Sequence, residues 1–324
     1  MRIDVHSHFL PMETITEFSG TLEEMKEPNS YRITIGGKVI SPMTKGFFDE
    51  KARLKEIRDL GIDRQILSPT HHVFNYSSPL EAALKMAHSQ NDGLAAVCKG
   101  NSQTFSGNAT LPMQDSKAAV AELERTYSKL ELDGVEIGTN IAGKNLDHES
   151  LYPVYEKIQD LKAPIFVHPN DFLGPERLSK YYMGIVVGTV AETTIAVTSL
   201  LLGGVFKKFP GLKFIFCHGG GAIPYQISRI KHALTTRDEI KGSTPFDDKD
   251  LKNLFFDSVL FDRRSMQFFV DAWGVDNVVF GTDYPFNMGN WKSHETLESL
   301  KLKDQKKIFE SNVLGLYRRT AMKW

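Results

Sequence analysis

Short runs of apolar residues alternate with longer amphipathic stretches along nearly the whole chain. The short runs have the length and the β-branched and aromatic content of buried strands, whereas the longer stretches repeat their apolar positions every three or four residues, as helices do. Strands are predicted at residues 1–8, 64–68, 108–113, 134–138, 164–168, 212–217, 254–257 and 277–280. Helices are predicted at residues 49–60, 80–98, 116–130, 150–161, 189–206, 221–234, 264–273 and 297–317.

This order of elements predicts an α/β fold, the (β/α)8 TIM barrel. A strand–helix–strand unit of this length requires parallel pairing with a right-handed crossover, and eight such units close into a barrel. We expect residues 1–324 to form one domain, with an insertion at about residues 12–48 that contains a β-hairpin turning at Gly36-Gly37. An open doubly wound sheet is the alternative, but it needs a glycine-rich loop after the first strand, where this chain has His6-Ser7-His8.

The composition narrows the classes of partner. The chain has 39 basic and 40 acidic residues, so no basic surplus favours nucleic acid. No apolar run approaches the ~18 residues that span a membrane, and the N-terminus has no leader pattern. Cys98 and Cys217 give no disulfide framework, and we therefore expect a cytoplasmic protein.

Ionisable side chains gather at the ends of the predicted strands. His6 and His8 are two residues apart in an extended chain, so both side chains point the same way. His168, His218 and Asp283 follow three later strands. Because catalytic groups of this fold lie at the carboxyl ends of its strands, these five residues are expected on one rim.

Each of these residues also has a structural interpretation, such as a core histidine or an aspartate that caps a turn. The shared position at strand ends favours a metal site instead. Imidazole and carboxylate ligands suit one divalent ion, Zn²⁺ most of all, with Mn²⁺ as an alternative. We predict His6, His8, His168 and Asp283 as its ligands, and His218 as a general acid or base beside it.

Two further histidines, His71 and His72, follow the second strand and are expected to line the pocket. Phe286, just beyond Asp283, is a candidate for an apolar wall.

Several segments, in order along the chain, resemble the mononuclear metal-dependent decarboxylase branch of the amidohydrolase superfamily, which includes aminocarboxymuconate-semialdehyde decarboxylase. They are Ile3 to His8, Thr110 to Gln114, Val135 to Thr139, Phe166 to Pro169, Ala191 to Ala196, Gly203 to Phe206, Phe214 to Pro224 and Gly281 to Phe286. The resemblance implies the same four metal ligands, and it implies that His218 is the catalytic base.

The resemblance also implies a homodimer in which Arg237 of one subunit binds a substrate carboxylate in the neighbouring active site. The chain departs from aminocarboxymuconate-semialdehyde decarboxylase at several pocket positions, among them His71 and His72, which stand where that enzyme is apolar. Ser41 stands in place of a carboxylate-binding arginine, and Ile185 is near the position of a tryptophan. We therefore expect the chain to share the reaction class of aminocarboxymuconate-semialdehyde decarboxylase but not the substrate of that enzyme.

The expected reaction is non-oxidative decarboxylation of an aromatic or conjugated carboxylic acid. Asp283 or His218 would protonate the carbon that loses carbon dioxide, or His218 would take a proton from an attacking water; the sequence leaves both routes open. A hydrolase or hydratase with the same site, acting on a lactone, amide or enol, is the main alternative. A nuclease is disfavoured by the neutral charge, and a non-catalytic barrel is disfavoured by His218.

Overall fold

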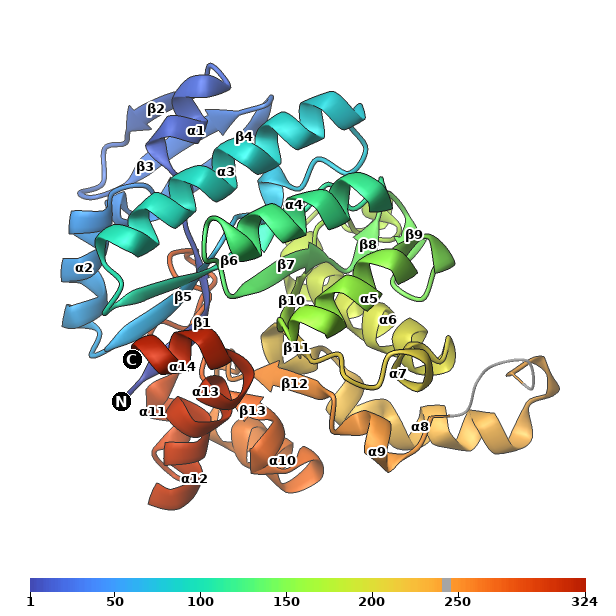
Figure 1. The fold of residues 1–324 in the computed structure, drawn as a ribbon. Helices are drawn as coiled ribbons and strands as arrows, with labels where there is room; N and C mark the ends of the chain where they lie inside the picture. Colours follow the sequence, from blue (N-terminus) through green and yellow to red (C-terminus); the bar gives the residue numbers. More distant parts are fainter. Residues whose placement is uncertain (241–245) are drawn as a thin grey trace.

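The computed structural model describes residues 1–240 and 246–324, and an eight-stranded parallel sheet lies at its centre (Figure 1). The strands follow one another around the sheet in chain order, so each connection joins two neighbouring strands. The sheet closes on itself, because the Val5 N–H donates to the Phe280 carbonyl oxygen (2.9 Å) and the Asp283 N–H donates to the His6 carbonyl oxygen (2.8 Å). The predicted barrel is confirmed. Its strands are β1 (Ile3–His8), β5 (Arg64–Ser68), β6 (Phe105–Thr110), β7 (Gly134–Gly138), β10 (Ile165–His168), β11 (Phe214–Phe216), β12 (Leu254–Asp257) and β13 (Val278–Val279).

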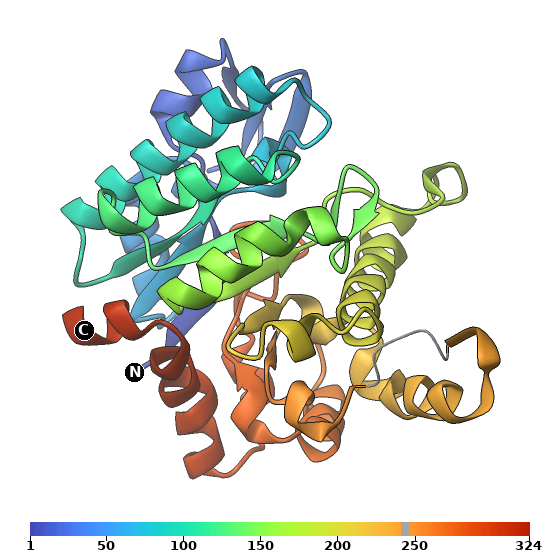
Figure 2. The same cartoon turned by 45° about the vertical axis from the view of Figure 1, so that its right-hand side comes forward.

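Helices cover the outside of the barrel, and α8 projects from its body (Figures 1 and 2). A side-chain cap fixes the start of some of them: the Asp49 carboxylate caps α2 by accepting from the N–H groups of Lys51 and Ala52, both at 2.9 Å. The helices are α1 (Met12–Glu17), α2 (Glu50–Asp59), α3 (Leu80–Gly100), α4 (Ser116–Ser128), α5 (Tyr152–Leu161), α6 (Thr189–Leu202), α7 (Val205–Lys208), α8 (Ile223–Thr236), α9 (Asp248–Leu251), α10 (Arg263–Trp273), α11 (His294–Leu297), α12 (Leu302–Lys306), α13 (Asn312–Leu316) and α14 (Arg318–Lys323).

The segment after β1 carries a small antiparallel sheet of its own. The hairpin around Gly36-Gly37 is formed by β3 (Tyr31–Ile35) and β4 (Lys38–Met43), and β2 (Thr21–Glu24) adds a third strand that the sequence did not predict. A second short hairpin, β8 (Asn140–Ile141) and β9 (Lys144–Asn145), follows β7.

Apolar side chains from strands that are not all neighbours meet inside the barrel. Ile3 and Val5 of β1 pack in one buried cluster with Phe166 of β10 and Val279 of β13. Val313 and Tyr317 from the C-terminal helices join the same cluster. The strands are thus held by a shared core, which leaves their carboxyl ends free to carry polar groups.

Two predicted boundaries were wrong. The third strand spans 105–110 and not 108–113, because Phe105 pairs with Gln65 and Pro112 offers no N–H for the ladder. The helix predicted at 189–206 ends at Leu202, since Gly204 takes a φ of +71° and α7 then starts afresh.

The prediction about apolar runs also needs correction. The helical stretch Gly184–Leu202 is long and apolar enough, by length and composition, to cross a membrane. In this structure it begins with a π-helical turn and continues as α6, and its residues Ala196, Val197 and Leu200 pack in the main core cluster.

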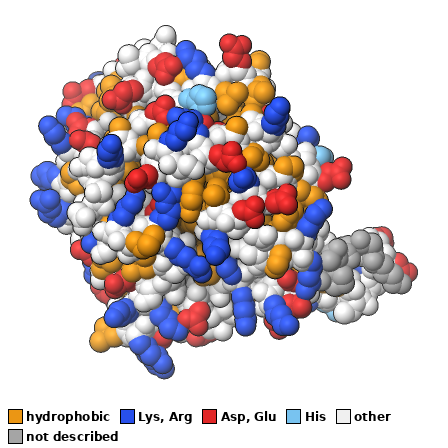
Figure 3. Space-filling model, viewed as in Figure 1, with side chains coloured by type: hydrophobic (Ala, Val, Ile, Leu, Met, Phe, Trp, Pro, Cys, Tyr) orange, Lys and Arg blue, Asp and Glu red, His pale blue; other side chains and the backbone are white. Residues whose placement is uncertain are grey.

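On the face shown in Figure 3, basic and acidic side chains are interspersed and form no stripe of a single sign. This face agrees with the balanced formal charge and offers no continuous basic track for a phosphate backbone.

Candidate metal centre

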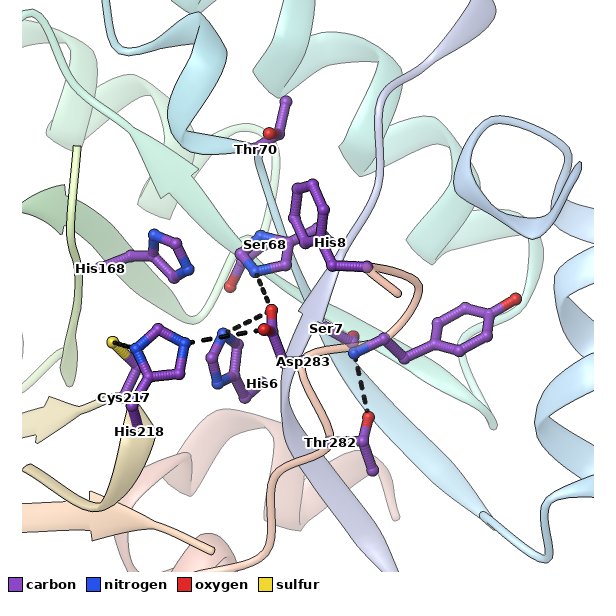
Figure 4. Close-up of polar contacts among 12 residues, drawn as sticks. His6, Ser7, His8, Ser68, Thr70, His168, Cys217, His218, Thr282 and Asp283 are labelled. Carbon is purple, nitrogen blue, oxygen red and sulfur yellow. Dashed lines mark hydrogen bonds and ion pairs between the residues drawn. The ribbon is translucent and has the colours of Figure 1, made fainter. Parts of the chain in front are cut away.

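The end of β1 brings His6 and His8 to the carboxylate of Asp283 (Figure 4). The Nε2 atom of His6 lies 3.2 Å from Asp283 Oδ1, and the Nε2 atom of His8 lies 3.3 Å from the same oxygen. Both imidazoles are fully buried. The alternation of side chains along an extended strand therefore places both imidazoles at one point, as predicted.

His168 and His218 complete the cluster from β10 and from the turn after β11. The His168 ring centroid is 4.8 Å from that of His8 and 5.3 Å from that of His6. The donor atoms of His6, His8, His168 and Asp283 all lie within 4.8 Å of one another. His218 Nε2 lies 3.6 Å from Asp283 Oδ2, so this histidine faces the same carboxylate from another side.

Three atoms of this cluster form no well-oriented hydrogen bond among the described residues, although the two nitrogens lie 3.2 and 3.3 Å from the carboxylate oxygen: His6 Nε2, His8 Nε2 and Asp283 Oδ1. Buried polar atoms without partners are costly, at roughly 1–3 kcal/mol each. Here they converge, and two of them are imidazole nitrogens and one is a carboxylate oxygen. The arrangement fits a divalent cation of the zinc or manganese type, which would satisfy all three.

The Nδ1 atom of each of the three candidate histidine ligands is held by the protein. His6 Nδ1 lies 2.5 Å from Asp257 Oδ2, His8 Nδ1 lies 2.8 Å from the Pro69 carbonyl oxygen, and His168 Nδ1 lies 2.9 Å from the Pro169 carbonyl oxygen. Such contacts fix the ring orientation and direct Nε2 toward the centre.

Sequence reasoning missed Asp257. It ends β12 and is fully buried, and its Oδ1 accepts from the Gly219 N–H at 2.9 Å. It therefore connects His6 to the turn that carries His218. Its place at a strand end, on the same rim as the other polar groups, was the signal that could have identified it.

The backbone around His218 and Asp283 is unusual. Both residues have left-handed φ angles, +55° and +60°, which few non-glycine residues adopt. Two residues after His218, Gly220 has a φ of +75°, and a Cβ there would lie 2.2 Å from the Phe256 ring. Glycine is thus required at position 220 by both the turn and the close approach of β12.

The charges in the cluster depend strongly on one another. Burial disfavours a charged His6, but the nearby Asp283 and Asp257 carboxylates outweigh this effect and raise the pKa of His6 to about 10. Burial lowers the pKa of His8 below its ordinary value and that of His168 well below it. Two of the histidines are therefore neutral near pH 7, which is the form that binds a metal.

A pocket of about 270 Å³ opens beside the cluster. His71, His72 and Phe286 line it, together with Ser41 and Ile185. The structure thus places these predicted residues together at one cavity.

Arg237 is not part of this pocket. It follows the projecting helix α8, its side chain is 63% exposed, and it pairs with Glu239. That position agrees with a role outside its own subunit, and the role itself stays a prediction.

The amidohydrolase family model matches residues 3–319. The chain belongs to this family. The family assignment covers the whole barrel, including β1 with its two histidines and the segment that carries Asp283.

Curated relatives span the chain almost completely. A 2-amino-3-carboxymuconate-6-semialdehyde decarboxylase from Dictyostelium discoideum is 33% identical over 331 residues, covering 97% of this chain and 89% of the relative. A 2-keto-4-carboxy-3-hexenedioate hydratase from Sphingobium sp. is 28% identical over 300 residues, covering 85% and 84%.

A solved structure shares the fold. The dihydroxybenzoic acid decarboxylase from Polaromonas sp. JS666, with bound manganese and the inhibitor 2-nitroresorcinol, has a TM-score of 0.80. It is 23% identical and covers 98% of this chain and 96% of its own.

Proposed function

We propose that the protein is a metal-dependent carboxy-lyase that removes carbon dioxide, without oxidation, from an aromatic or conjugated carboxylic acid. The observation that carries this proposal is the convergence of His6 Nε2, His8 Nε2 and Asp283 Oδ1, which are buried and form no well-oriented hydrogen bond among the described residues. The activities named for the relatives from Dictyostelium and Polaromonas support the reaction class.

His6, His8, His168 and Asp283 would hold one divalent ion. When bound, the ion supplies an electrophile that stabilises negative charge on a substrate oxygen as the carbon–carbon bond breaks. A set of three imidazoles and one carboxylate suits Zn²⁺, which we propose first. Mn²⁺ is the alternative, supported by the manganese in the Polaromonas structure.

His218 and Asp283 would handle the proton. The carbon that loses carbon dioxide must gain a proton, and both side chains face the cluster, with 3.6 Å between His218 Nε2 and Asp283 Oδ2. His218 also lies beside Cys217, whose Sγ is 3.2 Å from His218 Nδ1. The imidazole is therefore held on one nitrogen and keeps the other for the reaction.

The direct test is carbon dioxide release from metal-stripped protein resupplied with Zn²⁺ or Mn²⁺. The substrates would be ortho-hydroxy and ortho-amino aromatic acids and muconate semialdehydes. His218→Ala should lower the rate about 10²–10⁴-fold, as loss of a general acid–base group does. His148→Ala, on an exposed histidine, is the matched control and should leave the rate unchanged. No release from any acid by the fully loaded protein would contradict the proposal.

A hydratase is the second candidate, because the Sphingobium relative carries that activity by name. The same cluster would serve it, with His218 taking a proton from water. Product analysis separates the two candidates, since a hydratase adds water to a double bond and releases no carbon dioxide.

We also propose a homodimer in which Arg237 reaches the neighbouring active site. In this arrangement Arg237→Ala and His218→Ala would each be inactive alone. Random pairing of the two variants would restore about a quarter of wild-type activity, because half of the dimers are mixed and each has one complete site. No recovery in mixed dimers would show that Arg237 serves its own subunit or none. The cytoplasmic location expected from the cysteine content remains a proposal.

A further inference from the structure

Glu192 is a buried carboxylate to which neither the metal cluster nor the proposed reaction gives a task. It lies in the first turn of α6 and is 5% exposed. Its Oε1 atom accepts from the Leu173 N–H at 2.8 Å. Its Oε2 atom accepts from the Asn140 amide at 3.2 Å and from the Thr139 hydroxyl at 3.4 Å. One carboxylate thus joins α6, the segment after β7 and the connection that follows β10.

The connection between β10 and α6 forms one side of the pocket, and we call residues 169–188 the wall segment. The residues of this segment that line the cavity of about 270 Å³ are Pro169, Phe172, Tyr182 and Ile185. The position of the wall segment therefore determines the shape of the cavity on this side.

Apolar packing holds the first half of the wall segment only in part. Most side chains at residues 171–182 are exposed, and Leu173 is 75% exposed. Leu173 is therefore held through its backbone N–H. A longer hydrogen bond of 3.4 Å runs from the Asn140 amide to the Asp171 carbonyl oxygen. The contact of Leu173 with Glu192 is the shorter of these two anchors.

The anchor at Leu173 also fixes the neighbouring Phe172. The Phe172 ring packs against the π-helical turn that precedes α6, where a Cβ on Gly184 or Gly188 would lie 2.9 or 3.1 Å from the ring. Ile185 is on the same turn and lines the cavity. Release of Leu173 would therefore free Phe172 and remove support from Ile185.

A carboxylate suits this position because both of its oxygens accept. The Leu173 N–H and the Asn140 amide contact different oxygens, and both groups are donors. A glutamine could accept from only one of them, since its own NH₂ group would face the other. Glu192→Gln therefore breaks one side of this contact while the size of the side chain is kept.

We infer that Glu192 is a positioning residue that clamps the wall segment to the barrel and keeps the pocket in the shape that binds substrate. The inference rests on the proposed function for the place of the substrate. Glu192 itself is not among the residues that line the cavity, so it acts through Phe172 and Ile185.

The first test is tryptic cleavage of the metal-loaded protein, which needs no substrate. Arg177 and Lys180 are exposed and belong to the wall segment, so cleavage after them reports its local opening. Glu192→Gln should accelerate cleavage at these two bonds about tenfold, as loss of one hydrogen bond to a charged group does. Asn140→Ala should act in the same direction, and the two effects should not multiply, because both changes break the same clamp. Mass spectrometry identifies the cleaved bonds.

Two controls separate the clamp from a general loss of stability. Glu156→Gln makes the same exchange at an exposed residue of α5 and should leave cleavage unchanged. Val154→Ala, at a fully buried residue of α5, should lower the melting temperature without accelerating cleavage after Arg177 and Lys180. Circular dichroism would establish that each variant is folded.

The second test is steady-state kinetics with the acid from which the wild-type protein releases carbon dioxide fastest. Glu192→Gln should raise KM about tenfold and change kcat less than twofold, because the clamp acts on binding and not on the bond that breaks. A residue needed only for folding would leave KM unchanged in the folded variant.

Unchanged cleavage at both bonds in a folded Glu192→Gln variant would overturn the inference, as would equal acceleration by Val154→Ala or a lower kcat at unchanged KM. Absence of carbon dioxide release from every acid would contradict the decarboxylase proposal. The cleavage rates would still decide whether Glu192 clamps the wall segment, so the two failures are distinguishable.

Discussion

At the scale of single residues, Asp257 connects the candidate ligand His6 to the turn that carries His218. One of its oxygens lies 2.5 Å from His6 Nδ1, and the other accepts from the N–H groups of Gly219 (2.9 Å) and Val259 (3.1 Å). A carboxylate behind a ligating imidazole orients the ring and raises its basicity.

Asp257→Asn should therefore weaken metal binding about 10–100-fold while the protein stays folded. Competition with a chromophoric chelator measures this affinity directly. Asp262→Asn is the matched control, since Asp262 only caps α10 and asparagine caps equally well. Equal metal affinities in the two variants would show that His6 does not need the charge of Asp257.

Glu136, on β7, is a buried carboxylate without an assigned task. It is fully buried, neither oxygen has a hydrogen-bond partner among the described residues, and Oε1 lies 3.9 Å from His8 Nδ1. Burial raises the pKa of Glu136 well above its ordinary value of 4.5. The stability that its protonated form contributes is fully present below that value and is lost as the pH rises through the folded-state pKa.

In the metal-free protein, Glu136→Gln should remove this loss. The free energy of unfolding of the variant, minus that of wild type, should increase as the pH rises above about 4.5. The total increase should be at least ~1 kcal/mol for each pH unit that separates the folded-state pKa of Glu136 from 4.5. Urea denaturation at several pH values provides the measurement. Glu122→Gln should destabilise instead, because Glu122 accepts from Asn91 and Arg125. A pH-independent difference between Glu136→Gln and wild type would contradict the argument.

At the scale of elements, the turn after β11 determines where His218 stands. Gly220→Ala adds a Cβ that would lie 2.2 Å from the Phe256 ring, at a φ of +75°. Gly143→Ala has a comparable φ of +81° but nothing within 4 Å of the new Cβ. Comparing the Gly220→Ala and Gly143→Ala variants therefore distinguishes backbone strain, which both variants have, from a clash with β12, which only Gly220→Ala has.

Gly143→Ala should lower the free energy of unfolding by about 1 kcal/mol, as alanine at a positive φ does. Gly220→Ala should cost about 1–3 kcal/mol more, the usual range for overpacking, and should also reduce activity by displacing His218. Thermal unfolding and rate assays on both variants test this. Similar melting temperatures would mean that Phe256 moves aside freely.

Element order and the grouping of the candidate ligands were accessible from the sequence, because apolar periodicity reports strands and helices and the barrel rule places strand ends on one rim. That rule is why the sequence alone groups His6, His168 and Asp283. The strand β2 was missed because Thr21 to Glu24 has one apolar residue and lies at the surface. The contact of Asp257 with His6 depends on pairing between residues 251 positions apart, which a single sequence does not reveal.

At the scale of the whole molecule, the candidate ligands join distant parts of the barrel. His6 and His8 are on β1, His168 ends β10, and Asp283 follows β13. β1 and β13 are also the first and last strands of the sheet, and they meet where the barrel closes. A bound ion would therefore hold both edges of the closure as well as the opposite side of the barrel.

Removing the metal should for this reason destabilise the entire fold. An ion present at one hundred times its dissociation constant stabilises the folded state by about 2.7 kcal/mol, which shifts the melting temperature of a chain of this size by several degrees. Calorimetric melts with chelator and with added Zn²⁺ or Mn²⁺ would measure the shift. His168→Ala should abolish most of it, whereas His148→Ala should retain it in full, because His148 is exposed and outside the cluster. Equal melting temperatures with and without the ion in the wild-type protein would mean that the cluster does not hold the barrel closed through a metal.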